Sequence, residues 1–84
     1  MIRRRSGAFV LSNGALVGGL YDHVDGSYDA TWHPEGGRYV DFARRVPTSD
    51  EAVRLLHVHL LMNDPRYDGS LERDYPELFA ESAS

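Results

Sequence analysis

The sequence contains no cysteine and no lysine. Without cysteine the chain has neither disulfides nor thiolate ligands for a metal, and a reducing cytoplasm is the expected compartment. All nine basic residues are arginine. Because lysine codons are rich in A, this composition indicates a GC-rich genome, such as that of an actinobacterium or one of its phages.

Long apolar runs are also missing. The basic start of the chain leads into only a short apolar run, so we expect no signal peptide and no membrane span. Its 84 residues predict a single domain, with residues 1–6 as a flexible basic end and residues 64–84 as an acidic segment. Residues 46–84 hold three arginines against eight acids, which argues against broad affinity for nucleic acid.

Turn signals divide the first half of the chain into alternating apolar segments. Asn13-Gly14 and Asp25-Gly26 are pairs typical of two-residue hairpin turns, and a looser turn follows at 34–37. Four antiparallel strands are therefore expected near residues 7–12, 15–24, 27–33 and 38–45.

The second half of the chain changes to a helical pattern. Thr48 followed by Glu51 fits a capping box, and it predicts a helix over 49–63 that ends before Pro65. A shorter helix is expected within 74–82, with Asp74 as its cap. The fold class predicted is α+β: a four-stranded antiparallel meander, one main helix and a short C-terminal helix.

Hairpin register assigns the apolar residues to two faces of the sheet. A two-residue turn at Asp25-Gly26 places Tyr21 opposite Ala30, and the loop at 34–37 places Trp32 opposite Tyr39. One face is then aliphatic and carries Phe9, Leu11, Leu16, Leu20, Val24, Val40 and Phe42. The other face carries Val10, Val17, Tyr21, His23, Tyr28, Trp32 and Tyr39.

One main helix covers only one of these faces, and the aliphatic face suits its Leu56 and Leu60, which lie one turn apart. The aromatic face is then exposed, with Trp32 as the expected anchor of a partner. The residues expected to bind a partner are Tyr21, Tyr28, Trp32 and Tyr39, with Arg38, Arg44 and Arg45 at the rim. Three alternatives stay open: a bulge at Gly18-Gly19 exchanges the faces locally, the helix packs on the aromatic face and leaves the aliphatic face exposed, or the C-terminal segment covers the second face.

Catalytic and metal-binding patterns are weak. His57 and His59 would share one side of a strand, but on a helix two residues apart they diverge by about 200°. The acidic stretch 22–29 lacks the spacing of a calcium loop and fits a hairpin turn, in which Asp22 is expected opposite Asp29. We therefore expect no enzymatic activity, no metal and no cofactor.

The expected function is a small non-enzymatic protein-binding module that acts through the aromatic face. Tyrosine, tryptophan and arginine are common anchors of protein interfaces. If the gene is phage-borne, an inhibitor of host machinery such as an anti-defence protein fits this composition, and its compartment is the cytoplasm of the bacterium or infected host cell. Homodimerisation through the same face is a variant of this function.

The alternative is a sheet that binds DNA. The segment 28–56 resembles the arm-binding domain of tyrosine integrases in its Trp32, its Pro-Glu-Gly-Gly turn and its acid-Glu-Ala helix start. This resemblance covers about a third of the chain and implies a small sheet-plus-helix fold that reads DNA. The sequence departs from it at Asp29, Glu35 and Asp41, where a DNA-reading sheet favours cations.

Overall fold

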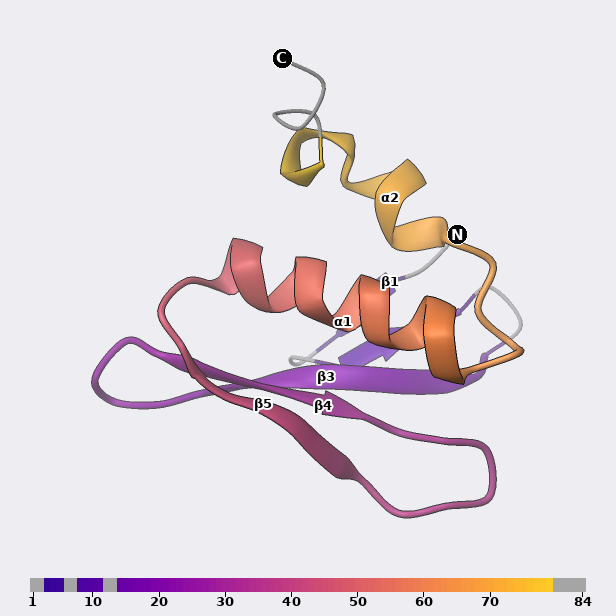
Figure 1. Ribbon diagram of the computed structural model, residues 1–84, viewed down its shortest axis with the longest axis horizontal. Helices are drawn as coiled ribbons and strands as arrows, with labels where there is room; N and C mark the ends of the chain where they lie inside the picture. Colours follow the sequence, from indigo (N-terminus) through magenta and orange to yellow (C-terminus); the bar gives the residue numbers. More distant parts are fainter. Residues whose placement is uncertain (1–2, 6–7, 12–13, 80–84) are drawn as a thin grey trace.

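The computed structural model describes residues 3–5, 8–11 and 14–79, and it contains one antiparallel sheet with the strand order β1-β2-β3-β4-β5. The strands are β1 (Arg3–Arg5), β2 (Ala8–Val10), β3 (Leu16–Asp22), β4 (Tyr28–Trp32) and β5 (Val40–Val46). They are followed by the helices α1 (Ser49–Asn63) and α2 (Ser70–Asp74) and by the 3₁₀ turn η1 (Pro76–Leu78) (Figure 1). The predicted fold class is confirmed.

The four predicted strands correspond to β2 to β5, and β1 is an additional edge strand. Its three arginines pair with β2 in the register Arg4 to Phe9, within the stretch that sequence reasoning treated as a flexible end. The remaining residues of that stretch lie outside the described part of the chain.

The hairpin loops before and after β3 each contain three residues, whereas two-residue turns were predicted. In the first loop the Leu11 N–H donates to the Ala15 carbonyl at 2.9 Å. The His23 N–H donates to the Ser27 carbonyl at 2.9 Å, and the Gly26 N–H donates to the His23 carbonyl at 3.1 Å. Gly26 has φ 90°, so this is a three-residue loop with a left-handed glycine at its last position. As a result Leu20, and not Tyr21, pairs with Ala30.

Bulges interrupt the register on both sides of the central strands. The pairing shifts between Phe9 and Val10, and it shifts twice between Tyr28 and Thr31. Arg45, with φ 55°, lies in the second irregular region, where its backbone N–H donates to the Asp29 carboxylate at 3.0 Å. The first shift falls at Val17 of β3, directly before the Gly18-Gly19 pair at which a bulge was considered, whereas the shifts between β4 and β5 were not predicted.

Helix α1 begins and ends where the sequence predicts. The Thr48 hydroxyl accepts the Glu51 N–H at 3.2 Å, and Asp50 and Glu51 lie in the first turn, where the helix dipole favours acids. Leu56 and Leu60 are fully buried, as expected. The C-terminal prediction is correct only in part, because a helix forms at Ser70–Asp74 and only a 3₁₀ turn forms at Pro76–Leu78.

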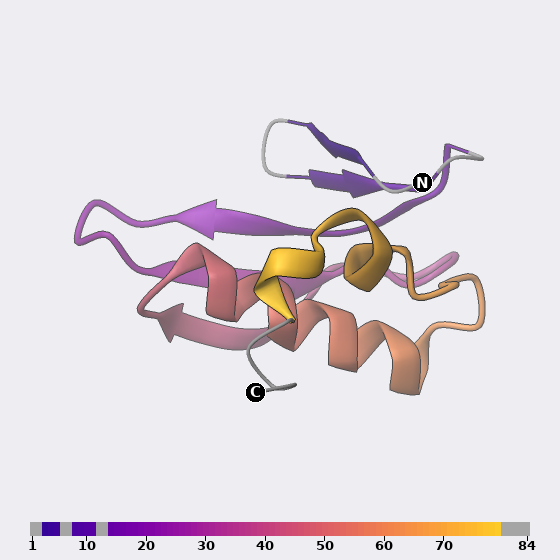
Figure 2. The ribbon, with the colours of Figure 1, turned by 90° about the horizontal axis from the view of Figure 1, so that it is seen from above.

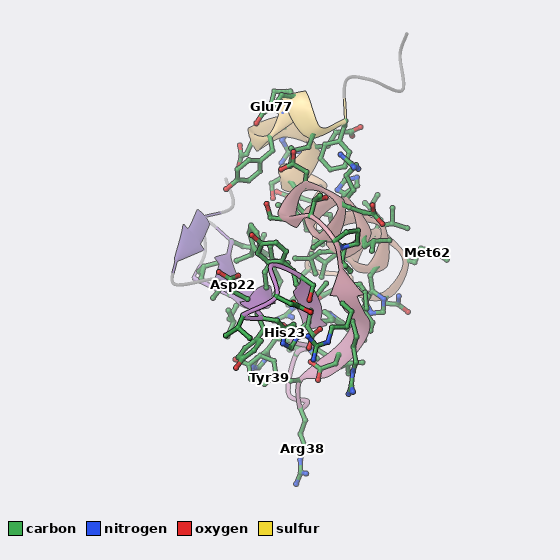
Figure 3. The ribbon with its side chains drawn as sticks, turned by 90° about the vertical axis from the view of Figure 1, so that its left-hand side faces the viewer. Asp22, His23, Arg38, Tyr39, Met62 and Glu77 are labelled. Atoms are coloured by element: carbon green, nitrogen blue, oxygen red, sulfur yellow. The ribbon has the colours of Figure 1, made fainter. Side chains whose placement is uncertain are left out.

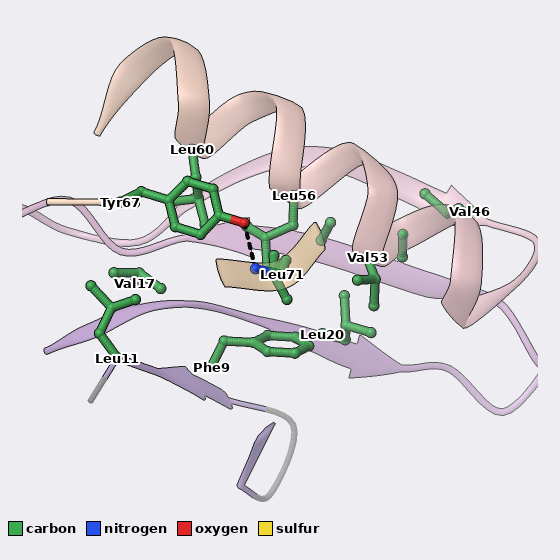
Figure 4. Packing of buried hydrophobic residues seen from close by; sticks show 12 residues of the cluster. Phe9, Leu11, Val17, Leu20, Val46, Val53, Leu56, Leu60, Tyr67 and Leu71 are labelled. Carbon is green, nitrogen blue, oxygen red and sulfur yellow. Dashed lines mark hydrogen bonds between the residues drawn. The ribbon is translucent and has the colours of Figure 1, made fainter. Parts of the chain in front are cut away.

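The core lies between the sheet and these helices (Figure 4). Leu71 of α2 is fully buried and belongs to the same cluster as Phe9, Val17 and Leu56. Figure 2 shows α2 and η1 beside α1, on its side toward β1 and β2. Residues 64–79 therefore fill the space next to α1 and do not cover the second face of the sheet, so the alternative in which Leu71, Leu78 and Phe79 cover that face is wrong.

Candidate partner-binding face

The expected aromatic face is divided between the two sides of the sheet. Tyr21 and Tyr39 are each 63% exposed on the side away from α1. Tyr28 and Trp32 are partly buried and pack against the core beneath α1. The three-residue loop at 24–26 is the physical reason, because a shift of one residue moves a whole strand to the opposite face. The prediction of a single face with all four aromatics is wrong.

Trp32 belongs to a polar network at the end of α1. Its Nε1–H donates to the Asp64 carboxylate at 3.0 Å, and the Arg66 guanidinium donates to the same carboxylate at 2.7 Å. Arg66 also donates to the His33 carbonyl at 2.8 Å. These donors lower the pKa of Asp64 to about 2, with the Arg66 hydrogen bond as the largest cause. Trp32 therefore ties β4 to the end of the helix.

The face opposite α1 contains a hollow of about 550 Å³. The floor of the hollow is a row of mostly small residues that runs across four strands. Ala8 pairs with Gly19, Gly19 pairs with Thr31, and Thr31 pairs with Asp41. The Thr31 hydroxyl donates to the Gly19 carbonyl at 3.1 Å. A row of small residues lets another molecule approach the sheet closely.

The two exposed tyrosines lie at opposite ends of this hollow. Tyr21 lies two residues beyond Gly19 on β3, and Tyr39 lies two residues before Asp41, directly before β5. Since β3 and β5 run in the same direction, the two backbone positions are offset by about 13 Å along the strands and by two strand spacings across the sheet. Figure 3 shows Tyr39 at the lower edge of the molecule, away from α1.

Each tyrosine rests against a histidine. The rings of Tyr21 and His23 meet edge to face at 5.1 Å, and those of Tyr39 and His33 meet at 4.8 Å. His23 Nε2 also lies 2.9 Å from the Asp29 carboxylate. The Arg45 backbone N–H and then His23 lower the pKa of Asp29, so this carboxylate is ionised at neutral pH beside the hollow.

The three arginines expected at the rim have different surroundings. Arg38 is exposed and projects away from the body of the molecule (Figure 3). Arg44 lies 3.5 Å from Asp41, and Arg45 lies 3.0 Å from Asp25, both in exposed pairs. Exposed pairs of this kind contribute little stability, so these side chains are free to rearrange when a partner approaches.

A second exposed surface was not predicted from the sequence. The outward side of α1 carries four apolar residues, and Met62 is the most exposed of them at 78% (Figure 3). They are Leu55, Val58, Leu61 and Met62. Leu55, Val58 and Met62 recur at i, i+3 and i+7. This spacing is the sequence signal for a second apolar side on the helix.

The residues considered for a metal are separated by the helix. His57 lies under the C-terminal segment, whereas the His59 ring stacks on Phe42 at 4.1 Å and contacts Trp32 at 4.8 Å. Across residues 3–5, 8–11 and 14–79, no group of three or more His, Asp or Glu is placed to hold a metal ion. Asp22 pairs with Tyr28, so the predicted pairing of Asp22 with Asp29 is wrong. Within the same residues, no helix is long and apolar enough to cross a membrane.

Comparisons of the chain with protein-family models, with curated proteins and with solved structures gave no match. Any functional argument for this protein therefore rests on its own geometry.

Proposed function

We propose that this protein is a non-enzymatic protein-binding module that holds its partner on the open face of the sheet, between Tyr21 and Tyr39. The observation that carries the proposal is the hollow itself. Two large aromatic side chains stay 63% exposed at the ends of a floor of small residues, and no described helix lies over them (Figure 1). Exposed apolar side chains around a concave surface are typical of interaction sites.

The chemistry of the face supports a protein partner. Tyrosine provides a large contact area with few rotatable bonds, so little conformational entropy is lost when it is buried in an interface. Asp29 and Asp41 add hydrogen-bond acceptors beside the rings. Arg38 and Arg44 provide polar contacts at the rim, where charges mainly influence the association rate.

Inhibition of a host protein complex is the role that we propose for this binding. The composition supports the setting of this proposal, because arginine as the only basic residue favours a GC-rich bacterium or a phage that infects one. The absence of cysteine favours the bacterial cytoplasm as the compartment.

Photo-cross-linking from single positions tests the proposed face. A photoreactive amino acid at Tyr39 should form a discrete adduct with a protein from an actinobacterial lysate. The same amino acid at Val24, which is fully exposed at the tip of a hairpin, is the matched control. An adduct from Val24 alone, or equal adducts from both positions, would contradict a partner site on the open face.

Self-association is a second candidate function, and the exposed apolar side of α1 favours it. Leu55, Val58 and Met62 lie on one stripe, and a helix that is apolar all round is normally covered. Sedimentation of the wild-type protein should then show a dimer that Val58→Glu abolishes and Val24→Glu leaves intact. A wild-type monomer at millimolar concentration would exclude this function.

Binding of DNA by the sheet is less well supported. Asp29 and Asp41 line the face that a DNA-reading sheet would present, and carboxylates repel phosphate. Each phosphate contact contributes roughly −0.9 to the slope of log affinity against log salt concentration, so a steep slope would favour DNA over protein.

A further inference from the structure

A buried hydrogen-bonded pair joins α1 to the C-terminal segment, and the proposed function does not use it. His57 Nδ1 lies 2.7 Å from the Tyr67 hydroxyl, and the two residues are 6% and 8% exposed. The same hydroxyl accepts the Leu71 N–H at 2.9 Å, which fixes the first turn of α2 (Figure 4). The Phe79 ring lies 4.8 Å from the other side of the His57 ring.

A neutral His57 that carries its hydrogen on Nε2 satisfies both hydrogen bonds of the Tyr67 hydroxyl. Burial raises the pKa of Tyr67 well above its ordinary value, so its hydroxyl keeps its proton at neutral pH. In this neutral form the Tyr67 O–H donates to His57 Nδ1, and the Tyr67 oxygen accepts the Leu71 N–H.

Protonation of His57 is incompatible with this arrangement. The imidazolium has an N–H on both nitrogens, so Nδ1 no longer accepts the Tyr67 O–H and can only donate to the second lone pair of the Tyr67 oxygen. The hydroxyl of Tyr67 has to turn away, and a cation is left in a buried position, which is costly unless the cation is paired.

The charged groups around the pair do not remove this conflict. Glu72 of α2 favours the imidazolium, but burial is the larger effect and lowers the pKa of His57. Arg54, one turn earlier on α1, donates to the Leu78 carbonyl at 3.1 Å and is a cation on the same side of the helix. Asp68 and Arg73, which flank Tyr67, are paired with each other at 3.0 Å.

We propose that residues 67–79 form a pH-sensitive latch, which closes onto α1 while His57 is neutral and opens when His57 is protonated. The open state leaves His57 in water, where its ordinary pKa is 6.5. The closed state is therefore fully favoured above that pH, and it loses stability as the pH falls below it.

Opening exposes an apolar surface that the closed latch fills. Leu71 is fully buried against the cluster that contains Phe9, Val17 and Leu56. This surface lies on the helix side of the sheet, opposite Tyr21 and Tyr39, so the latch and the proposed partner face are independent of each other. The latch would give the protein a second, acid-dependent binding surface.

Amide hydrogen exchange of the whole chain at pH 7.5 and pH 5.0 tests the latch. After correction for intrinsic exchange, the Leu71 amide should be less protected than the amides of β3 and β4 at both pH values, and its protection should fall at least about tenfold from pH 7.5 to pH 5.0. His57→Gln, which cannot be protonated, should remove this pH dependence. His59→Gln is the matched control, because His59 lies on the same helix against Trp32 and Phe42 and should leave the dependence intact.

The wild-type protein provides a second readout that does not depend on a folded variant. The loss of Leu71 protection should begin near the ordinary histidine pKa and should level off where the imidazole resonances of His57 titrate. Equal protection of α2 and the sheet at both pH values, unchanged protection at pH 5.0, or a dependence abolished by His59→Gln would each overturn the latch.

Discussion

Gly18 lies where β3 passes closest to α1. A Cβ atom at this position would lie 2.5 Å from the Thr31 carbonyl oxygen and 2.9 Å from a methyl group of Leu56. The carbonyl belongs to the sheet and cannot move away without breaking pairing. We expect Gly18→Ala to reduce the free energy of unfolding by about 1–3 kcal/mol, measured by urea denaturation. An unchanged midpoint would show that the helix sits farther from the sheet.

Trp32 is expected to act through stability and not through binding. Trp32→Phe keeps an aromatic ring but removes the donor to Asp64, which should reduce the free energy of unfolding by about 1–3 kcal/mol. Partner capture by the folded variant should be unchanged. A fully stable variant that no longer captures the partner would restore Trp32 as an interface residue.

The sequence predicted the elements better than it predicted the side chains of the candidate site. The α1 boundaries follow from Thr48 and Pro65, which are local signals. The site depended on whether the loop before Ser27 has two or three residues, and Asp25-Gly26 is compatible with both. The third residue of this loop decides whether Trp32 faces the helix or solvent. The floor of the hollow was missed because small residues carry no pattern of their own.

The N-terminal cap of α1 contributes measurably to the free energy of unfolding. Thr48→Ala removes the acceptor for the Glu51 N–H and should reduce the free energy of unfolding by about 1 kcal/mol. Thr48→Ser retains the hydroxyl and is the control that should keep most of the stability. Equal losses for both substitutions would indicate that the methyl group, and not the hydrogen bond, is important.

The whole domain should lose stability in two acidic ranges. Asp64 has a pKa of about 2 in the folded chain against 3.8 for a free side chain, so its contribution is present above pH 4. Protonation removes about 2 kcal/mol as the pH falls from about 4 to 2. His57, whose pKa is lowered by burial, adds a separate loss that starts below pH 6.5.

Thermal unfolding from pH 8 to pH 2 should show both ranges. Asp64→Asn should flatten the lower range and leave the upper one, because Asp64 and His57 take part in separate contacts. A single acid transition that persists in Asp64→Asn would assign the lower range to other carboxylates.

The open face of the sheet is most directly tested by a variant that removes both exposed rings. Tyr21→Ser combined with Tyr39→Ser changes two side chains that are each 63% exposed, so the free energy of unfolding should fall by no more than about 1 kcal/mol. The cross-linked partner should be lost from this variant and retained by Trp32→Phe. A folded double variant that still captures the partner would contradict a binding site on this face.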